Sequence, residues 1–441
     1  MSRAPLIAWV LSWLTASCGA RSGLAIPAAS PDAGPADAGT DAAPCIPTGI
    51  ERCGGGDEDC DGRVDEGLPL GPIAEALTLR TTEFETNPPA VCDTCQWAWR
   101  PSLVATPTGF VVPFHLGIYG GREMPALFAR DTDASGRPLG EVRHVGESVP
   151  LHLARLSGPS STGEHWIEAT LRIGADDLGG FVIVAPDGAM RVVTTGAGRR
   201  AHASSSVPLR DGALSVWQED GAPSRLDAAR FDASGRSLGS HTISGDLFTT
   251  ATLTDHTIAA RVDAEGAVVF VERFVSEPRA FTLHAARLDA DGQAIEAPRT
   301  ITPGIDHLSP MRASATDGGY LVFDPGNGSP PAVRFVSSSL ETSSAPEAID
   351  DRNGSDLAFD FLRIEGGFVV ISTDAILRLD PRGHVLARWR GRLAPGTDEG
   401  NAYVVSPDLA MRGGRLFVAW HGIAPSGTPN TVWIRELGCL E

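Results

Sequence analysis

Gly266-Ala-Val-Val-Phe-Val271 is a glycine followed by a run of apolar, β-forming residues, and six other stretches of the chain share this pattern. They are Gly109-Phe-Val-Val-Pro-Phe114, Gly212-Ala-Leu-Ser-Val-Trp217, Gly319-Tyr-Leu-Val-Phe323, Gly367-Phe-Val-Val-Ile371, Gly414-Arg-Leu-Phe-Val-Ala-Trp420 and, as a weaker member, Gly163-Glu-His-Trp-Ile-Glu-Ala169. Successive leading glycines are 54, 49, 54, 53, 48 and 47 residues apart. Because short runs of branched and aromatic residues are typical of strands, the pattern predicts seven units of one repeating β structure.

This period sets the fold class. An all-β repeat of about 50 residues favours a seven-bladed β-propeller, in which each unit forms one four-stranded sheet. A β-solenoid is one alternative, but solenoid coils repeat at shorter periods. A pair of β-sandwiches is another, but it gives no reason for seven similar units. The sequence therefore predicts an all-β, seven-bladed propeller.

Tight polar turns punctuate the units at two places. The first set precedes the glycine-led strand: Pro107-Thr-Gly109, Arg210-Asp-Gly212, Ala264-Glu-Gly266, Thr316-Asp-Gly318 and Ile364-Glu-Gly366. The second set comes later in the unit: Asp133-Ala-Ser-Gly136, Pro186-Asp-Gly188, Asp232-Ala-Ser-Gly235, Asp289-Ala-Asp-Gly292 and Asp380-Pro-Arg-Gly383. Asp and Gly supply the positive φ angles of hairpin turns. The small residues of 202–206 and 312–316 suit a crowded innermost strand.

The two ends of the repeat region are expected to meet. The last unit ends at 431–439 without an outer strand of its own. Leu70–Arg80 resembles the segments 136–143 and 292–299, which are expected to form outer strands. The N-terminal segment can therefore complete the seventh blade and remove two exposed sheet edges. On this basis the propeller covers residues 71–441.

The first 44 residues have the composition of an export signal and a tether. Arg3 followed by the apolar run 4–14 predicts a signal peptide over residues 1–17, since the run is shorter than the ~20 residues that cross a bilayer. Leu14-Thr-Ala-Ser-Cys18 resembles a bacterial lipobox, which implies a lipid on Cys18 and an outer membrane-anchored protein, periplasmic or at the cell surface. The alternative is an ordinary signal peptide in which Cys18 has no role. Residues 18–44, rich in Ala, Pro, Asp and Gly, are predicted to form a disordered tether.

An acidic loop follows the tether, within a small module at 45–70. Placed on a calcium-loop template, Asp57, Asp59 and Asp61 occupy positions 1, 3 and 5. The remaining oxygen ligands would come from the Arg63 carbonyl, Asp65 and Glu66, although Leu68 stands where a bidentate Glu is usual. Oxygen ligands at alternate positions suit a hard cation, so the predicted cofactor is a structural Ca²⁺ ion. The alternative is a solvated acidic linker that binds no metal.

From Cys53 to Gly67 the loop resembles the EF-hand-like metal-binding motif of secreted bacterial proteins, Cys-x-Gly-x-Asp-x-Asp-Cys-Asp-Gly-x-x-Asp-Glu-Gly. The resemblance implies metal binding and says nothing about the rest of the chain. Some proteins with this motif are described as copper-associated. Hard carboxylates without a nearby His or Met argue against copper here.

Cysteine usage fits an oxidising compartment. Lipidation of Cys18 would leave six of the seven Cys, which allow 15 pairings. Among the possible pairings we favour a disulfide between Cys53 and Cys60, because it would cross-link the two ends of the acidic loop. Cys92 and Cys95 are expected to form a structural disulfide, with each other or with Cys439.

The charge balance limits the partners. The chain has 36 basic and 55 acidic residues, a net charge of −19, and all of its basic residues other than His are Arg. Nucleic acid is therefore excluded as a partner. Beyond Cys18 no stretch is apolar and long enough to span a membrane, so attachment would be through the lipid or a partner.

Catalytic motifs give few leads. The sequence has no G-x-S-x-G, no H-E-x-x-H, no P-loop and no dinucleotide fingerprint. Its turns also lack the Ser-x-Asp-x-Gly-x-x-Trp order expected of a propeller glycosidase. Loops after the glycine-led strands should gather on one face, which makes that face the candidate ligand site. The candidate residues are His115, Glu219, Asp220, Glu272, Asp324, Asp374 and His421, with His152, His202, His256 and His307 nearby. For any one of them taken singly, the favoured interpretation is an ordinary solvated loop residue; as a set they are the candidate ligand-binding face.

Together these features predict a non-enzymatic cell-envelope lipoprotein whose propeller binds a protein or glycan through one face. The alternative is a secreted propeller hydrolase or lyase that acts on extracellular polysaccharide. Fold class alone does not separate the two, because propellers host both kinds of function.

Overall fold

The chain divides into two compact units, Met1–Cys45 and Ile46–Glu441, and every residue described below belongs to the second. The computed structural model describes residues 70–79, 97–99, 101–117, 126–155, 163–173, 176–194, 201–219, 225–244, 258–263, 266–276, 279–305, 312–324, 330–340, 344–345, 347–349, 359–372, 375–391, 393, 403–423 and 431–438. The elements in these ranges are all strands, and no helix there is long and apolar enough to cross a membrane.

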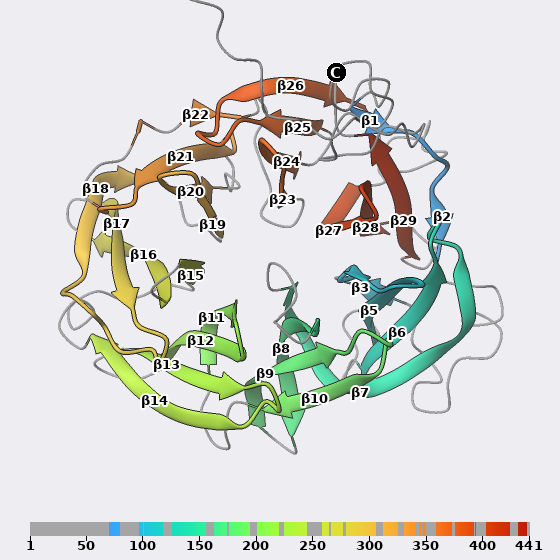
Figure 1. Ribbon diagram of the computed structural model, residues 1–441, viewed down its shortest axis with the longest axis horizontal. Coiled ribbons are helices and arrows are strands. Elements are labelled where there is room, and N and C mark those ends of the chain that lie inside the picture. Colours follow the sequence, from blue (N-terminus) through green and yellow to red (C-terminus); the bar gives the residue numbers. More distant parts are fainter. Residues whose placement is uncertain are drawn as a thin grey trace, which may run out of the picture. The chain divides into compact units, whose positions relative to one another are not determined.

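Seven antiparallel blades are arranged in a ring (Figure 1), which confirms the predicted fold class. Blade 1 contains β3 (Trp97–Trp99), β4 (Val104–Ala105), β5 (Gly109–Gly117), β6 (Ala126–Asp133) and the first part of β7 (Pro138–Arg155). Blade 2 contains the second part of β7, β8 (His165–Ile173), β9 (Asp176–Val184) and β10 (Met190–Thr194). Strand β7 is therefore the outer strand of one blade and the inner strand of the next.

The next four blades are separate four-stranded sheets. Blade 3 contains β11 (Ala201–Leu209), β12 (Gly212–Glu219), β13 (Arg225–Asp232) and β14 (Ser237–Ser244), and blade 4 contains β15 (Ile258–Asp263), β16 (Gly266–Ser276), β17 (Arg279–Leu288) and β18 (Arg299–Ile305). Blade 5 contains β19 (Arg312–Thr316), β20 (Gly319–Asp324), β21 (Ala332–Ser337) and β22 (Glu347–Ala348), and blade 6 contains β23 (Asp360–Ile364), β24 (Gly367–Ser372), β25 (Ala375–Leu379) and β26 (Val385–Arg390). The small-residue strands β11 and β19 are innermost, as predicted.

Blade 7 combines the two ends of the repeat region. Its three inner strands are β27 (Tyr403–Arg412), β28 (Arg415–Ile423) and β29 (Thr431–Gly438). The outer position is held by two short pieces from the N-terminal side, β1 (Gly71–Pro72) and β2 (Leu77–Thr78), which both pair antiparallel with β29. The segment whose sequence resembles outer strands therefore closes the ring.

The core is distributed between the blades. The described residues form seven buried apolar clusters, and each cluster joins side chains of two neighbouring blades. Successive residues of a strand face opposite sides of its sheet, so each middle strand contributes to two of these clusters. In β16, for example, Val269 packs toward blade 3 and Phe270 toward blade 5. Strands that are buried on both faces require nearly continuous apolar runs, which explains the repeat seen in the sequence.

The turns between the third and fourth strands of blades 1, 3, 4 and 6 share one hydrogen-bond pattern. The Oδ1 atom of Asp232 accepts the N–H groups of Ser234 and Arg236 at 2.9 and 3.0 Å. Asp133, Asp289 and Asp380 accept the equivalent pairs of N–H groups in their own blades. The carboxylate thus fixes the turn from inside, as in an Asx turn. The glycine that follows has φ +81° in blade 3, which L-residues rarely adopt.

Each of these turns also contacts the preceding blade. A Cβ atom at Gly235 would lie 2.5 Å from Cγ2 of Val193 in blade 2. Arginines of the preceding blade donate to the same turns. Arg191 Nη1 of blade 2 donates to the Ser234 carbonyl at 2.6 Å, and Arg230 Nη1 of blade 3 donates to Asp291 Oδ1 at 2.6 Å. The turn is therefore both a local hairpin and a contact between blades.

The Gly235→Ala variant should lose about 2–5 kcal/mol of unfolding free energy in urea denaturation. A Cβ in the left-handed region costs about 1–2 kcal/mol, and overpacking against Val193 costs about 1–3 kcal/mol more. Gly318→Ala is the matched control, because Gly318 has φ +79° but no atom near its virtual Cβ, so only the backbone cost of about 1–2 kcal/mol is expected. Equal losses in the two variants would mean that the Gly235 turn does not pack against blade 2.

The turn of blade 6 should make stability depend on pH. The hydrogen bond between His384 Nδ1 and Asp380 Oδ2 (2.8 Å) and their charge attraction raise the pKa of His384. Burial alone would raise the pKa of Asp380, but bonds from His384 and Arg382 outweigh it and lower that pKa. The His384 contribution is complete below about pH 6.5, the unfolded pKa, and is lost as pH rises through the raised folded value. The Asp380 contribution is lost as pH falls below about 4.

His384→Gln, which installs the residue found at Gln293 in blade 4, should therefore destabilise the protein more at pH 5.5 than at pH 8.5. Urea midpoints of both proteins at the two pH values measure the difference. If the urea midpoint of the wild type exceeds that of the variant by the same amount at both pH values, the pair of Asp380 and His384 does not make stability depend on pH.

Candidate functional site

Several of the predicted residues lie outside the described residues. These are the lipidated Cys18, the bridge between Cys53 and Cys60, the metal ligands Asp57, Asp59, Asp61, Arg63, Asp65 and Glu66, and the face residues Asp220 and Asp374, with His256 and His307. They remain predictions from the sequence.

The other five face residues lie in strands, so their placement in loops is wrong. His115 belongs to β5, Glu219 to β12, Glu272 to β16, Asp324 to β20 and His421 to β28. The reason is that the second strand of each blade runs further than the apolar core of its repeat, up to 11 residues in β16. All five still lie in the second strand of their blade, beyond the glycine-led start. They therefore lie toward the same end of the ring, which we call the strand-end face. The opposite end carries the turns and is the turn face.

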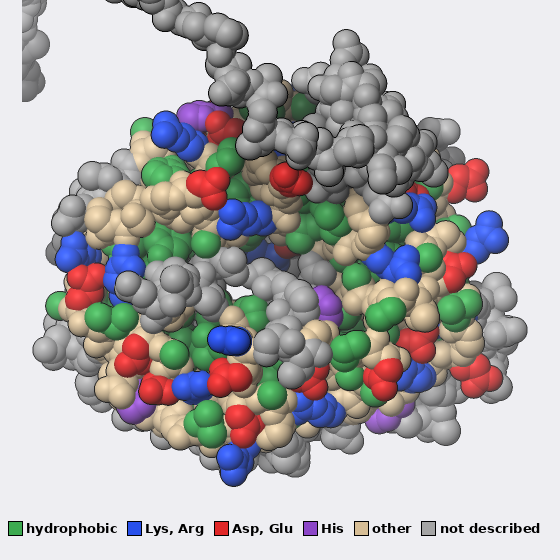
Figure 2. All heavy atoms as spheres, viewed as in Figure 1, with side chains coloured by type: hydrophobic (Ala, Val, Ile, Leu, Met, Phe, Trp, Pro, Cys, Tyr) green, Lys and Arg blue, Asp and Glu red, His purple; other side chains and the backbone are tan. Residues whose placement is uncertain are grey.

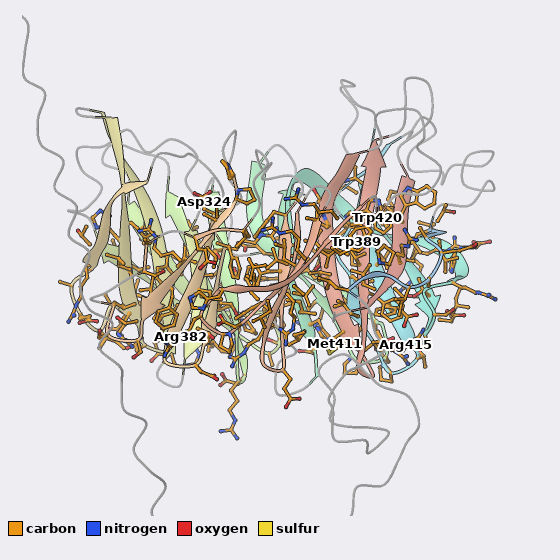
Figure 3. The ribbon with its side chains drawn as sticks, turned by 90° about the horizontal axis from the view of Figure 1, so that it is seen from above. Asp324, Arg382, Trp389, Met411, Arg415 and Trp420 are labelled. Atoms are coloured by element: carbon orange, nitrogen blue, oxygen red, sulfur yellow. The ribbon has the colours of Figure 1, made fainter. Side chains whose placement is uncertain are left out.

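Figure 3 shows the two ends. Asp324 lies on the same side of the ring as Trp389 and Trp420, and Arg382 and Arg415 lie on the other side. The view down the ring in Figure 2 shows a hollow at the centre, with acidic and basic side chains interspersed around it.

The two histidines of the set are buried. His115 is 0% exposed and His421 is 4% exposed. Each continues the alternation of its strand: His421 follows Phe417 and Ala419, which pack toward blade 1, and His115 follows Val111, which packs toward blade 2. The structure therefore places both imidazoles between blades and not on the open surface.

The Asp324 carboxylate acts electrostatically on a buried cation. Burial lowers the pKa of Arg334 in the neighbouring strand β21, and the Asp324 carboxylate opposes this effect. Arg334 is 6% exposed, and a buried guanidinium requires a countercharge to offset the loss of hydration. The charge of Asp324 thus offsets part of the cost of burying Arg334 in the same blade.

Sequence reasoning missed two acidic residues near the axis. Asp360, which begins the innermost strand β23, is 5% exposed, and its Oδ2 accepts the N–H of Leu409 in β27 at 2.7 Å. Its Oδ1 forms an ion pair with Arg312 of β19. Blades 5, 6 and 7 are joined through this single carboxylate.

Asp408 repeats the arrangement one blade further on. Its Oδ2 accepts the Leu103 N–H at 2.6 Å and the Ser102 hydroxyl at 2.7 Å, both from blade 1. Blades 7 and 1 are the pair whose meeting closes the ring. The sequence did contain one signal for these two residues. Each is an Asp in an innermost strand, whereas the innermost strands of blades 3 and 5 carry small residues around Ser205 and Ser314.

The arrangement has clear chemical consequences. A carboxylate oxygen that accepts a backbone N–H and a hydroxyl is held in a fixed structural position. Among the described ranges, no three His, Cys, Asp or Glu side chains are grouped so as to hold a metal ion. The axial carboxylates are therefore connectors between blades.

Comparison with known proteins adds fold information only. No family model and no curated protein matches the sequence. Among solved structures, Trypanosoma rangeli sialidase in complex with sialic acid is 10% identical with a TM-score of 0.42, over 75% of this chain and 59% of the sialidase. The β-propeller domain of the Trilobed protease from Pyrococcus furiosus is 9% identical with a TM-score of 0.44, over 77% and 97%. The six-bladed Aleuria aurantia lectin is 9% identical with a TM-score of 0.41, over 77% and 96%. The chain thus spans about three fifths of the sialidase, and these neighbours are β-propellers with different functions.

Asp408→Ala should lower the unfolding free energy by about 1–3 kcal/mol, because it leaves the Leu103 N–H and the Ser102 hydroxyl without their acceptor. Asp317→Ala is the control. Asp317 pairs with Arg363 but its side chain is 83% exposed, and an exposed pair contributes about 0–1 kcal/mol. Urea denaturation of both variants gives the comparison. A loss at Asp408 no larger than that at Asp317 would show that the seam does not depend on this carboxylate.

Proposed function

We propose that this chain is an exported, non-enzymatic binding scaffold of the bacterial cell envelope. The propeller is the binding body, and a lipid on Cys18 followed by the tether of residues 18–44 would hold it at the outer membrane. The sequence supports export through the signal-peptide pattern of residues 1–17 and the lipobox resemblance. The partner would be an envelope protein or glycan.

One observation carries the non-enzymatic part of the proposal. A polysaccharide hydrolase needs an acid and a base or nucleophile open to the scissile bond. The carboxylates of Asp360 and Asp408 near the axis instead accept hydrogen bonds from neighbouring blades. The carboxylates of Asp360 and Asp408 are therefore already used in holding neighbouring blades together.

The acidic loop has a structural role in this proposal. Ca²⁺ held by Asp57, Asp59, Asp61, Arg63, Asp65 and Glu66, with a bridge between Cys53 and Cys60, would give the chain a rigid joint between the tether and the strand β1. Four residues, from Gly67 to Leu70, separate the last of these ligands from Gly71. An extracellular calcium module of this kind would bind with a dissociation constant of about 10⁻⁴–10⁻³ M.

Capture from envelope fractions tests the binding role. The mature chain carrying Cys18→Ser is immobilised and incubated with solubilised envelope, with and without a chelator. The wild-type face should retain a defined protein or glycan, and Glu219→Arg at the strand-end face should reduce that capture at least tenfold. Asp317→Arg, in the turn between β19 and β20 on the turn face, is the charge-matched control and should leave capture unchanged.

A parallel incubation with envelope polysaccharide tests the alternative. Release of reducing or unsaturated chain ends by the purified protein would establish a hydrolase or lyase and overturn the scaffold proposal. In the capture experiment, equal retention of the partner by the parent chain, the Glu219→Arg variant and the Asp317→Arg variant would mean that the strand-end face is not the binding surface.

A further inference from the structure

The innermost strands differ at one level of the ring. In blades 3 and 4 the residues at this level are small, Ser205 and Ala259. In blades 5, 6 and 7 the same register position holds the charged residues Arg312, Asp360 and Asp408. These strands border the central opening in Figure 1, where Figure 2 shows a hollow. At this level the wall of the hollow is therefore polar over blades 5 to 7 and carries small residues over blades 3 and 4.

The Arg312 guanidinium lies on the axial side of the neighbouring blade. Its side chain leaves β19 on the same face as its cross-strand partner Phe323, which packs toward blade 6. The carboxylate of Asp360, with which it forms an ion pair, belongs to β23 and accepts the Leu409 N–H of blade 7. The ion pair therefore passes along the inner edge of β23, because that strand is the innermost one of its sheet. The Arg312 side chain is 40% exposed there.

Most of the Arg312 donors are open to a ligand. A guanidinium has five N–H groups in a planar fork, and among the described residues the Arg312 side chain donates only to Asp360. Asp360 is 5% exposed and is itself fixed by the Leu409 N–H at 2.7 Å. The guanidinium is therefore oriented before a ligand arrives, which lowers the entropy cost of binding.

An aromatic ring lies beside this cation. The ring of Phe361 in β23 stacks on that of Phe323, the cross-strand partner of Arg312, with centroids 4.2 Å apart and an angle of 18° between the planes. Phe361 also meets Phe368 edge to face, with centroids 6.2 Å apart. Phe361 is half-buried, whereas Phe359 in the same apolar cluster is 2% exposed. Because β23 is innermost, the uncovered part of the Phe361 ring faces the hollow.

The charge of this wall limits the ligands that it can bind. Arg312 and Asp360 carry opposite charges, and Asp408 adds a carboxylate one blade further on. The whole chain has a net charge of −19. An anionic ligand would therefore meet no net positive charge in the hollow. Neutral hydroxyl groups suit the wall better, because they can accept hydrogen bonds from the guanidinium and donate to backbone carbonyl groups on the inner edges of β19 and β23.

We propose that Arg312 and Phe361 form a subsite for one neutral sugar ring of a glycan. The C–H groups on one face of a pyranose carry partial positive charge and would stack on the negative face of the Phe361 ring. The hydroxyl oxygens at the edge of the sugar would accept hydrogen bonds from Arg312. Arg312 begins β19 and Phe361 is the second residue of β23, so both lie toward the strand-end face. The subsite rests on the proposed binding function and narrows its partner to a neutral glycan that enters the hollow from that face.

Titration calorimetry and saturation-transfer NMR of the mature chain carrying Cys18→Ser test the subsite. The neutral probes are the methyl glycosides of D-glucose, D-galactose and D-mannose, and the acidic probes are the corresponding methyl uronosides. At least one neutral probe should bind, with saturation transfer strongest at the C–H groups of one ring face. Its uronoside should bind about tenfold more weakly, because the wall has no net positive charge.

Two substitutions of phenylalanine test the aromatic contact. Phe361→Leu keeps an apolar side chain but removes the aromatic face, and it should weaken binding of the neutral probe about three- to tenfold. Phe359→Leu is the matched control, because it removes a ring from the same apolar cluster that is buried away from the hollow, and it should leave the dissociation constant unchanged. Urea midpoints of the two variants show how much each loses in core packing.

Two substitutions of arginine test the hydrogen bonds. Arg312→Lys keeps a positive charge opposite Asp360 but loses the planar fork, and it should weaken binding about three- to tenfold. Arg363→Lys is the matched control. Arg363 lies in the same strand β23 but toward the turn face, where it donates to the Ala315 carbonyl at 3.2 Å, so its substitution should leave sugar binding unchanged.

The outcomes separate this subsite from the binding role itself. Absence of binding by all three neutral glycosides would overturn the subsite, and so would a uronoside that binds as tightly as its neutral counterpart. Equal dissociation constants for the parent chain, Phe361→Leu and Arg312→Lys would place the sugar elsewhere on the protein. Capture of an envelope protein that is lost in Glu219→Arg, without any sugar binding, would leave the scaffold proposal standing and remove the subsite alone.

Discussion

The contact between the turn after the third strand and the preceding blade is the constraint on which the ring depends. The turn must be rigid, and the Asp carboxylate makes it so by accepting two N–H groups of its own loop, as in Asp232. The turn must also approach closely, which only Gly235 allows beside Val193. Arginines from the preceding blade, such as Arg191, then donate to its carbonyl groups. Because each apolar cluster lies between two blades, a turn that failed to dock on the preceding blade would weaken the cover of the cluster that those two blades share, such as the one between blades 2 and 3.

Ring closure adds a second requirement, because the final interfaces join parts of the chain that are far apart in sequence. The outer strand of blade 7 is short and interrupted, because it consists of the two-residue strands β1 and β2, both paired to β29. Arg435 supports the gap by donating to the Ala74 carbonyl at 2.6 Å. Asp408 holds blade 7 to blade 1 at the axis, and Arg412 donates to the Thr106 carbonyl at 2.9 Å on the turn face. The closure of the ring therefore relies on these three sets of polar bonds in addition to the apolar cluster between blades 7 and 1.

The exclusive use of arginine takes on a structural meaning in this fold. Composition alone suggested no role for it. In the ring, one guanidinium often satisfies several acceptors at once: Arg230 contacts Asp211 and Asp291, and Arg378 donates to three carbonyl groups of its own blade. A lysine ammonium has fewer donors and no planar fork with which to bridge two chain segments. The blade contacts use that difference repeatedly.

The sequence by itself determined the repeat, the number of blades, the turn residues and the strand that closes the ring. Those features are local, because a glycine-led apolar run and an Asp-Gly turn have their own backbone preferences. The number of times they recur along the chain gives the number of blades. Only the tertiary structure decided the roles of His115, His421, Asp360 and Asp408. Whether a strand residue faces a neighbouring blade or solvent depends on packing against a partner many residues away, 49 positions for Asp360 with Leu409 and 305 for Asp408 with Leu103. Side chains expected on an open face proved to lie between blades for this reason, since both faces of every middle strand are covered once the ring is closed.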